Sequence, residues 1–442
     1  MTDAVMMTEA EMVRDPDGGR YHYELPVAFF RLMLGETLAY SSGYYLTAAD
    51  SLAQAQRQKL EMLCKKLELG PHDHLLEMGA AWGSFALYAA QNYGCQVTGI
   101  SLSPVQREYV MQQAQSRGIA HLIQYDLMHA LDLKYPDQTF SKVISIEATE
   151  HIVDLETFYQ GLYRVMQNDG LISVQVIAGR SNLGNTAFPS EPEARAFIRE
   201  YFFPFGEWSP ISQTLTAIEN AGFELVDLEN ITDHYYITQK QWLHNLETAY
   251  ADHAAHTGVN PQRYLAQILF AAGSVDTFAR STNLDYQVLS RKNGPGLRRP
   301  LPLNRDGLRL AGPTRPTLPP QALVGQVELE IVAGTTRLAQ SDAAWYVDLA
   351  KLGDGIQSGH ASHPVCTLRI TQADVPALLS GELSWPDAFV QGRITYTGDL
   401  TAMLWVRDLV RTNFGNTSDG LVYSDGGENR WINPSAIKSQ TQ

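Results

Sequence analysis

The chain has 442 residues, of which 44% are hydrophobic and 18% are charged. This is the composition of a globular protein, and the length predicts two or three domains rather than one core. A collagen-like or wholly disordered chain is excluded. Lys and Arg total 33 against 48 Asp and Glu, which gives a formal net charge of −15. A protein with this charge is not expected to bind nucleic acid.

The cysteines and the beginning of the chain indicate a compartment. Cys64, Cys95 and Cys366 are odd in number and far apart, so neither a disulfide framework nor a metal site is expected. Residues 1–19 carry several acids and no apolar segment of the signal-peptide kind. The apolar stretch 265–275 is too short to span a bilayer. These features predict a cytoplasmic protein without an export signal or a membrane span.

Residues 1–70 are predicted to form a helical segment. Leu60, Leu63, Cys64 and Leu67 follow the i, i+3, i+4, i+7 spacing of a helix with one apolar face. That face is expected to pack on the domain that follows, so that this segment completes the site proposed below.

From residue 71 onward, short apolar runs alternate with helical stretches. The runs that predict strands are 75–78, 96–100, 141–146, 171–177, 223–228 and 286–289. This alternation predicts an α/β domain with a doubly wound parallel sheet over 71–292. Aromatic residues gather at 201–205 and 235–242, where they indicate either plain core or a lid over an apolar substrate. We place the lid at about 190–285.

A linker and a second domain follow. Residues 293–323 hold Gly-Pro and Arg-Pro clusters that cannot continue a helix or a strand. Apolar residues then alternate with polar ones at 327–331, 345–349 and 366–370, which predicts antiparallel strands in an α+β domain over 324–413. The tail 414–442 is rich in Gly, Asn, Ser and Asp and is predicted to be flexible.

The linker region is basic although the protein is acidic. Its basic residues are Arg291, Lys292, Arg298, Arg299, Arg305, Arg309 and Arg315. A solvated linker is the plain interpretation, and peripheral contact with an anionic membrane is the alternative.

The strongest chemical signal is the segment 77–83, Glu-Met-Gly-Ala-Ala-Trp-Gly, directly after the first predicted strand. Small residues at such a turn let the backbone approach a ligand, and the following helix N-terminus favours an anionic group. A nicotinamide site would need GxGxxG and an acid ending the second strand, but Ala81, Ser84 and Ser101 occupy those positions. A tight turn without a ligand is the alternative. Ala81 adds only a methyl group and is compatible with a negative φ, the conformation assumed for it here.

With its surroundings, this segment resembles the cyclopropane-fatty-acyl-phospholipid synthase family of S-adenosylmethionine (SAM) methyltransferases. The resemblance rests on 75–90 (LLEMGAAWGSFALYAA), on 97–106, on 145–151 (SIEATEH) and on further motifs from Tyr21 to about Arg291. It implies a seven-stranded Rossmann-like sheet with a helical lid, and SAM as the cofactor.

The resemblance also implies which residues contact SAM. From the methionine part through the ribose to the adenine, they are Gly79 and Ala80 with Tyr40 and Ser41 closing over them, Ser101 and Gln106, and Asp126 and Leu127, with Leu102 and Ile146 as further contacts. In this family a hydroxyl residue and a glutamine replace the usual ribose-binding acid, which accounts for Ser101.

Methylation of an alkene produces a carbocation, so the reacting site is expected to be apolar, rich in aromatic faces and poor in water. By resemblance, a bound bicarbonate removes the proton. The positions that would hold it are Ser42, Glu150, Gln175, Ile177 and Tyr235. Ser42 and Gln175 replace a cysteine and a histidine of the family, which puts bicarbonate use and cyclopropane formation in question. Glu150 is therefore expected to accept the proton directly or through water, and Tyr235 to position the acceptor or stabilise positive charge.

Each candidate also has a plainer interpretation. Glu150 could cap the next helix, His151 could orient Glu150 or a backbone carbonyl, and Tyr235 could be a packed aromatic residue. The Glu147-x-x-Glu150-His151 pattern also resembles plant alkaloid N-methyltransferases, in which carboxylates hold and deprotonate an amine. A non-catalytic lipid carrier or scaffold is a third hypothesis, which the joint retention of cofactor and proton-accepting residues disfavours.

The second domain resembles the sterol-carrier-protein-2 (SCP2) family at 377–389 and 391–399. This resemblance implies an apolar tunnel that holds an acyl or isoprenoid chain. A role in dimerisation or stability is the alternative, from which a homo-oligomer would follow. The whole sequence predicts a SAM-dependent methyltransferase that transfers methyl or methylene to carbon of a hydrophobic, unsaturated, lipid-like or secondary-metabolite acceptor.

Overall fold

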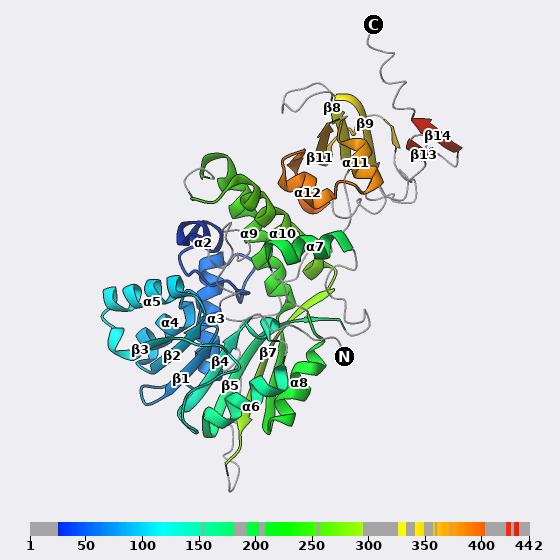
Figure 1. Ribbon diagram of the computed structural model, residues 1–442. Helices are drawn as coiled ribbons and strands as arrows, with labels where there is room; N and C mark the ends of the chain where they lie inside the picture. Colours follow the sequence, from blue (N-terminus) through cyan, green and yellow to red (C-terminus); the bar gives the residue numbers. More distant parts are fainter. Residues whose placement is uncertain are drawn as a thin grey trace. The chain divides into compact units, whose positions relative to one another are not determined.

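The computed structural model describes residues 25–152, 154–180, 192–202, 208–253, 257–294, 326–332, 341–348, 357–358, 360–371, 373–402, 421–425 and 428–432. The chain divides into two compact units (Figure 1). The first holds the described residues up to Val259 and those from Thr277 to 294. The second holds Asn260–Asp276 and the described residues from 326 onward.

A seven-stranded sheet forms the centre of the first unit. Its strands are β1 (His74–Met78), β2 (Gln96–Ser101), β3 (Ile123–Leu127), β4 (Phe140–Ile146), β5 (Met166–Gly179), β6 (Phe223–Asn230) and β7 (Asn283–Lys292). The helices are α2 (Val27–Leu34), α3 (Leu52–Lys66), α4 (Ser84–Tyr93), α5 (Pro104–Ser116), α6 (Leu155–Val165), α7 (Pro192–Tyr201), α8 (Ile211–Asn220) and α9 (Thr232–His253), with short turns η2 (Ala120–Leu122) and η3 (Thr149–His151). A further helix, α10 (Pro261–Ala279), contributes residues to both units.

The sheet is mixed rather than wholly parallel. In the strand order β3-β2-β1-β4-β5-β7-β6, the first five strands pair in parallel. β7 runs antiparallel to both β5 and β6. All six predicted strands are confirmed, but the prediction of a parallel sheet is wrong at this edge, because apolar periodicity reports burial and not strand direction. The prediction also lacked β3, whose alternation of buried and exposed residues is only five residues long.

Helices cover both faces of this sheet (Figure 1). On one face α3, α4 and α5 pack with Leu75 of β1 and Ile144 of β4. On the other face α6 and α8 pack with Leu76 and Val143 of the same two strands. Neighbouring residues of a strand point to opposite faces, so these adjacent pairs serve both layers. The predicted doubly wound arrangement is confirmed.

α3 carries the predicted apolar stripe. Its members are Leu60, Leu63, Cys64 and Leu67. All are 3% exposed or less and lie in the core shared with α4. Ser51 starts the helix with a capping box, because its hydroxyl accepts from the Gln54 backbone N–H while the Gln54 side chain accepts from the Ser51 N–H.

The interval 190–285, expected to be a lid, also contains parts of the sheet and its cover. α8 packs on the sheet, and β6 and β7 are two of its strands. α9 carries Tyr235 and Trp242, which pack edge to face at a centroid distance of 5.9 Å. Residues 203–205 of the aromatic run lie outside the described residues.

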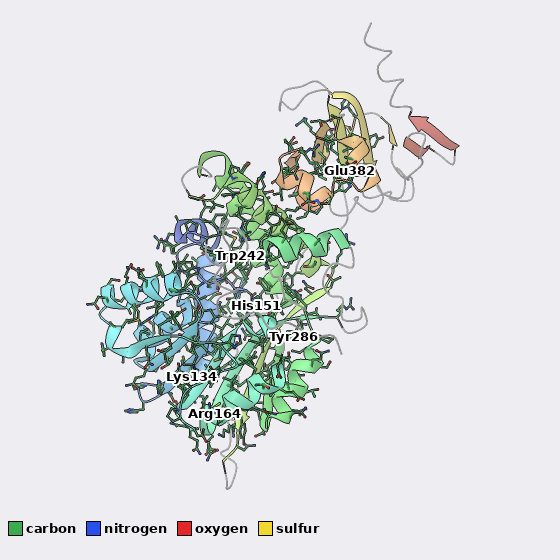
Figure 2. All side chains as sticks on the ribbon, viewed as in Figure 1. Lys134, His151, Arg164, Trp242, Tyr286 and Glu382 are labelled. Carbon is green, nitrogen blue, oxygen red and sulfur yellow. The ribbon has the colours of Figure 1, made fainter. Side chains whose placement is uncertain are left out.

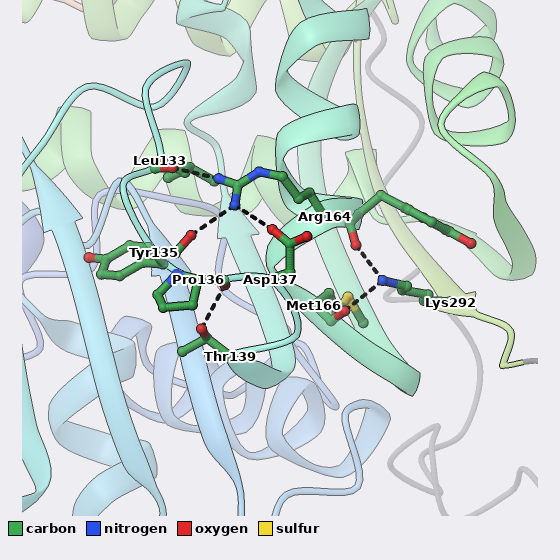
Figure 3. A network of polar contacts seen from close by, with 9 residues as sticks. Leu133, Tyr135, Pro136, Asp137, Thr139, Arg164, Met166 and Lys292 are labelled. Atoms are coloured by element: carbon green, nitrogen blue, oxygen red, sulfur yellow. Dashed lines mark hydrogen bonds and ion pairs between the residues drawn. The ribbon is translucent and has the colours of Figure 1, made fainter.

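Arg164, near the end of α6, holds the loop between β3 and β4 (Figure 3). Its guanidinium donates to the Leu133 carbonyl at 2.6 Å and to the Tyr135 carbonyl at 2.8 Å. It also pairs with the Asp137 carboxylate at 2.9 Å. A planar guanidinium presents several donors in a fixed geometry, so one side chain ties the loop to the helix.

Lys292, the last residue of β7, contacts the carboxyl end of α6 (Figure 3). Its ammonium donates to the carbonyls of Tyr163 and Met166, both at 2.7 Å. A helix leaves such carbonyls without partners, and positive charge is favoured there. Arg291 and Lys292 are 2% and 6% exposed and lie in β7. They therefore belong to the sheet, and the prediction that they are part of the basic linker is wrong. The other basic residues of that linker lie outside the described residues.

The second unit contains a five-stranded sheet in the order β10-β9-β8-β11-β12. Its strands are β8 (Gln326–Val332), β9 (Ser341–Asp348), β10 (Gln357–Ser358), β11 (Pro364–Thr371) and β12 (Ile394–Gly398), and its short helices are α11 (Val375–Ser380) and α12 (Trp385–Val390). The α+β class is confirmed. β8 and β11 pair in parallel, so the prediction of antiparallel strands is wrong for this pair and holds for the other neighbours.

Within the predicted flexible tail, β13 (Leu421–Asp425) and β14 (Glu428–Ile432) pair as an antiparallel hairpin. The rest of that segment lies outside the described residues. Among the residues that are described, no helix combines the length and the apolar character needed to cross a bilayer.

Candidate active site

The turn after β1 brings backbone close to backbone at the carboxyl edge of the sheet. Gly79 has a φ of +69°, and a Cβ atom there would lie 2.6 Å from the Cβ of Ala148. Ala81 has a φ of 44°, so the expectation of a negative φ is wrong. The Tyr125 hydroxyl donates to the Ala81 carbonyl at 2.7 Å and holds the turn in this strained conformation. The absence of a side chain at position 79 is therefore required by the protein's own packing, whether or not a ligand binds there.

The residues predicted at the ribose and adenine lie at the ends of β2 and β3. The Ser101 hydroxyl donates to the buried Gln106 side chain at 2.9 Å. Ser101 pairs in register with Leu127, and Leu102 follows it directly. Leu102 and Leu127 are each 43% exposed, which is unusual for large apolar side chains side by side at one edge. This arrangement fits a flat apolar group such as adenine, with polar groups available for the ribose.

Three further predicted cofactor residues lie at the same edge of the sheet. The Asp126 carboxylate accepts from the Tyr135 hydroxyl at 2.6 Å and from the Gln124 amide at 2.8 Å. Ala80 is buried, and its N–H donates to a carbonyl of β2. Ile146 is half-buried at the end of β4. All three lie at the carboxyl ends of the parallel strands, as the resemblance implies.

Tyr40 and Ser41 lie on the segment between α2 and α3. Ser41 is buried, and its hydroxyl accepts from the Lys59 ammonium at 2.6 Å. Its carbonyl accepts from the Gln56 amide at 2.7 Å. The Tyr40 ring lies 5.3 Å from the Trp242 ring between centroids. Two elements thus fix the segment that the resemblance places over SAM.

A cage of three donors surrounds the carboxylate of Glu147, the residue that follows β4. The Ser42 backbone N–H donates to its Oε1 at 2.9 Å, and the Gln175 amide donates to the same oxygen at 2.6 Å. The Tyr235 hydroxyl donates to Oε2 at 2.6 Å. Ser42, Gln175 and Tyr235 are buried and come from three separate parts of the chain. Three of the five positions predicted around an exogenous anion therefore contact the Glu147 carboxylate instead.

The orientation of the Gln175 amide is set from behind by a chain of hydrogen bonds. Lys66 donates to Gln287 Oε1 at 2.8 Å, and the Gln287 amide N–H donates to Gln175 Oε1 at 3.0 Å. An ammonium can only donate, so it fixes which atom of each amide is the oxygen. The NH₂ group of Gln175 must then face Glu147. Lys66 is itself held by the Glu229 carboxylate at 2.6 Å.

Glu150 lies in η3 and has one carboxylate oxygen engaged and one not. Its Oε1 accepts from the Ile177 backbone N–H at 2.5 Å. Its Oε2 is buried and has no hydrogen-bond partner in the described part of the chain. Burial and the nearby Glu147 raise the pKa of Glu150 to about 8. A carboxylate with a raised pKa and an unengaged oxygen is suited to accept a proton.

His151 is exposed at the surface. The protein that surrounds its ring still desolvates it, which lowers the pKa of His151 to about 4. The ring is therefore neutral at physiological pH. Figure 2 shows His151 between the large sheet and α9, the helix that carries Trp242. His151 follows Glu150 in η3, and its chemical role stays a prediction.

The Tyr235 ring, whose hydroxyl donates to Glu147, lies in a cluster of aromatic rings. The Tyr235 ring lies 4.4 Å from the Phe278 ring and 5.9 Å from the Trp242 ring. Trp242 in turn contacts Tyr40. Such ring faces stabilise a neighbouring positive charge, and their bulk excludes water.

Three buried carboxyl groups surround one buried ammonium group, that of Lys59. Lys59 interacts with Glu77, Glu147 and Asp285, and burial lowers its pKa to about 8 against their opposing effect. Burial raises the pKa of Glu77 to about 8 and that of Asp285 well above its usual range. It also raises the pKa of Glu147, although Tyr235 and the other donors oppose that shift. Part of this acid group therefore holds protons at neutral pH.

Sequence motifs identify Ser42, Glu150, His151, Gln175 and Tyr235 but not the roles of Glu147, Lys66 or Asp285. Glu147 entered only through the pattern of the N-methyltransferase alternative. Its position directly after a buried strand and three residues before Glu150 was the available signal. Nothing local in the sequence indicates Lys66, because its role depends on Gln287, which lies 221 residues away.

Two family models match the chain. One described as mycolic acid cyclopropane synthetase matches residues 11–287, and one described as the SCP-2 sterol transfer family matches residues 325–411. A protein of Pseudomonas putida described as a probable fatty acid methyltransferase is 31% identical over 296 residues, which are 66% of this chain and 74% of that protein.

Two further similarities agree. The cyclopropane-fatty-acyl-phospholipid synthase of Escherichia coli is 27% identical over 282 residues, which are 63% of this chain and 69% of that one. A mycolic acid cyclopropane synthase solved in complex with SAH and CTAB has a similar fold, with a TM-score of 0.57, 23% identity, and coverage of 66% of this chain and 100% of that one. The chain therefore belongs to the mycolic acid cyclopropane synthetase family and is a SAM-dependent methyltransferase.

Proposed function

We propose that the enzyme methylates an unsaturated carbon of a hydrophobic, lipid-like acceptor. The observation that carries this proposal is Glu150, whose buried Oε2 has no partner among the described residues and whose pKa is raised to about 8. Tyr235, which donates to Glu147, packs against the rings of Trp242 and Phe278, and such rings can stabilise a cationic intermediate on the acceptor. The names of the relatives, which include a fatty acid methyltransferase, support a lipid acceptor.

Each component of the site has a separate task. When bound, SAM would supply the methyl group as a sulfonium electrophile, with S-adenosylhomocysteine as the leaving group. The acceptor's double bond provides the electron pair of the new carbon–carbon bond, and the aromatic rings face the positive charge left on the acceptor. Glu150 Oε2 then takes a proton from an adjacent carbon, and the electrons of that C–H bond remain on the acceptor as a double bond or close a ring. Positioning and exclusion of water provide much of the rate.

A second candidate is methylation of a hydrophobic amine. The pair of neighbouring carboxyl groups, Glu147 and Glu150, favours it, because such a pair can hold an ammonium and remove its proton. The two candidates differ in the product: one carries the new group on carbon, the other on nitrogen.

The test uses the full chain and SAM labelled in its methyl group. The enzyme is incubated with a lipid extract containing unsaturated acyl chains and, separately, with a soluble metabolite extract. We expect label in the lipid fraction, on a carbon resistant to acid hydrolysis, and no such label with the Glu150→Gln variant. Label in a basic metabolite would favour the amine candidate. A chain that binds SAM and labels neither extract would contradict both.

We also propose that the second unit holds the acyl or isoprenoid chain of the acceptor. The match of residues 325–411 to the SCP-2 sterol transfer family supports this role. The buried strand β11 and the apolar helix α12 provide the apolar side chains, including Leu368 and Phe389.

A further inference from the structure

The carboxylate of Glu147 sits in a site that looks built for an anion. Its two oxygens receive three hydrogen bonds, from Ser42, Gln175 and Tyr235, at 2.6 to 2.9 Å. Two of the donors are a backbone N–H and a hydroxyl, and the third is an amide whose orientation Lys66 fixes through Gln287. The Gln175 amide is oriented independently of Glu147, so at least this donor of the cage is preorganised.

Glu147 reaches this cage at a cost in backbone conformation. Its φ is 48°, which lies in the left-handed region that residues other than Gly, Asn and Asp seldom adopt. Strain of this kind persists only where the surroundings impose it, and it gathers at functional sites. A residue that served only to fill space would not need this conformation together with three donors.

We propose that Glu147 is a built-in anion: it occupies the place of a small exogenous oxyanion, so that the enzyme works without bicarbonate. This inference rests on the proposed function, because it assigns Glu147 a task in the same site. Glu147 is a positioning residue, since both of its oxygens are engaged while Glu150 Oε2 has no partner among the described residues. Its negative charge holds the Tyr235 hydroxyl and increases the proton affinity of Glu150.

A chain-held carboxylate has physical advantages over a bound ion. It is present at every turnover without the entropic cost of capturing an ion from solution. It also removes dependence on dissolved carbon dioxide. The same geometry predicts that removing the side chain leaves three buried donors without an acceptor, a site that a small carboxylate or bicarbonate can fill.

The first experiment measures binding and needs no acceptor. In Glu147→Gly the glycine accepts the positive φ, and the side chain is removed. The melting temperature is measured in sodium formate and in sodium bicarbonate, against sodium chloride of equal ionic strength. We expect a rise of about 3 °C for the variant when the anion is about ten times above its Kd, and a further rise with the logarithm of the anion concentration. Wild type should show no rise.

Asp169 offers a matched control, since it is an exposed acid with a φ of 60° and, within the described part of the chain, no such cage. Asp169→Gly should show no anion effect. The double variant Glu147→Gly with Tyr235→Phe loses one donor and should bind formate at least about fivefold more weakly, the loss expected for one hydrogen bond to an anion. A folded Glu147→Gly that binds neither formate nor bicarbonate would overturn the proposal.

The second experiment measures methyl transfer in buffer depleted of carbon dioxide. Wild type should keep full turnover, and Glu147→Gly should lose about 10²-fold, the scale of removing one preorganised electrostatic group. Bicarbonate or formate should restore much of that loss. Wild type that is stimulated or thermally stabilised by bicarbonate contradicts the proposal. If Glu147→Gly does not fold, the response of wild type to bicarbonate tests the proposal instead. Glu147→Gln, which keeps the shape of the side chain, then serves as the second variant, and added anions should not raise its turnover. Failure to methylate any acceptor would refute the proposed function and leave the binding result to judge Glu147.

Discussion

Glu150→Gln keeps the shape of the side chain and its hydrogen bond from Ile177, and it removes the charge and the proton-accepting oxygen. Loss of a general base lowers turnover by about 10²–10⁴-fold. Affinity for SAM should stay near that of wild type, because Glu150 is proposed to face the acceptor and not SAM. The assay is label transfer from SAM under saturating acceptor, with SAM affinity measured by calorimetry. Wild-type activity should rise with pH up to about 8, the pKa of Glu150, and the variant should lose that limb of the profile.

The same substitution should also change stability in a way that depends on pH, which would not be expected if Glu150 had only a structural role. Burial raises the Glu150 pKa from 4.5 to about 8, so the folded state binds this proton more tightly than the unfolded state. The stability that this proton contributes is therefore fully present below about pH 4.5 and is lost as pH rises through about 8. A shift of this size corresponds to at most ~5 kcal/mol, and partial exposure of the side chain reduces it to ~1–3 kcal/mol.

Glu150→Gln has no charge to bury, so its free energy of unfolding should exceed that of wild type by ~1–3 kcal/mol at pH 9 and match it near pH 4. Urea unfolding across that range measures the difference. If Glu150 only capped a helix, the variant would instead be less stable by about 1 kcal/mol throughout. That outcome, or full turnover of the variant, would refute the assignment of Glu150 as the buried proton acceptor.

Three further predictions concern other parts of the molecule. Leu102→Ser and Leu127→Ser should each weaken SAM binding by about 5–30-fold in calorimetry with an unchanged melting temperature, since each loses about 1–2 kcal/mol of apolar contact. Leu225→Ser, 39% exposed on the edge strand β6, is the control that should leave SAM affinity unchanged. Lys66→Met should lower kcat about tenfold with little effect on SAM affinity, because the Gln175 amide loses its fixed orientation. Lys65 is 41% exposed, so Lys65→Met is the control that should leave kcat unchanged. An unchanged kcat in Lys66→Met would show that the chain of amides is not needed. Equilibrium dialysis of a labelled unsaturated fatty acid should find two bound chains per protein, and a single one would contradict acyl binding by the second unit.

The features predicted from sequence are those with a local cause. The stripe of α3 needs only the periodicity of Leu60, Leu63, Cys64 and Leu67, and the buried strands need only runs of apolar residues. The direction of β7 and the φ of Ala81 have no such local signal. Gly79→Arg, which would seem a clean way to block SAM from the sequence alone, is a poor test, because even a Cβ at this position meets Ala148.

The site shows the same division. Glu150 and Tyr235 were predicted because they lie within recognisable motifs. The donors of Glu147 lie 105, 28 and 88 residues away along the chain, so no window of sequence contains the cage. Ser42 contributes its backbone N–H to that cage while its hydroxyl donates to the Gly43 carbonyl, so the residue type at position 42 says little about its role.

The amide chain behind Glu147 also bears on how the sheet assembles. Gln175 of β5 and Gln287 of β7 are direct cross-strand partners. If β7 slipped by one residue, Gln175 would face Tyr286 or Val288, and two buried amides and the Lys66 ammonium would lose partners. Each unsatisfied buried group costs about 1–3 kcal/mol, so slipped registers are strongly disfavoured. An antiparallel strand inserted next to a parallel set has many apolar registers open to it, and this pair of glutamines selects one. Folding therefore cannot finish with a misaligned β7 and an intact Glu147 cage.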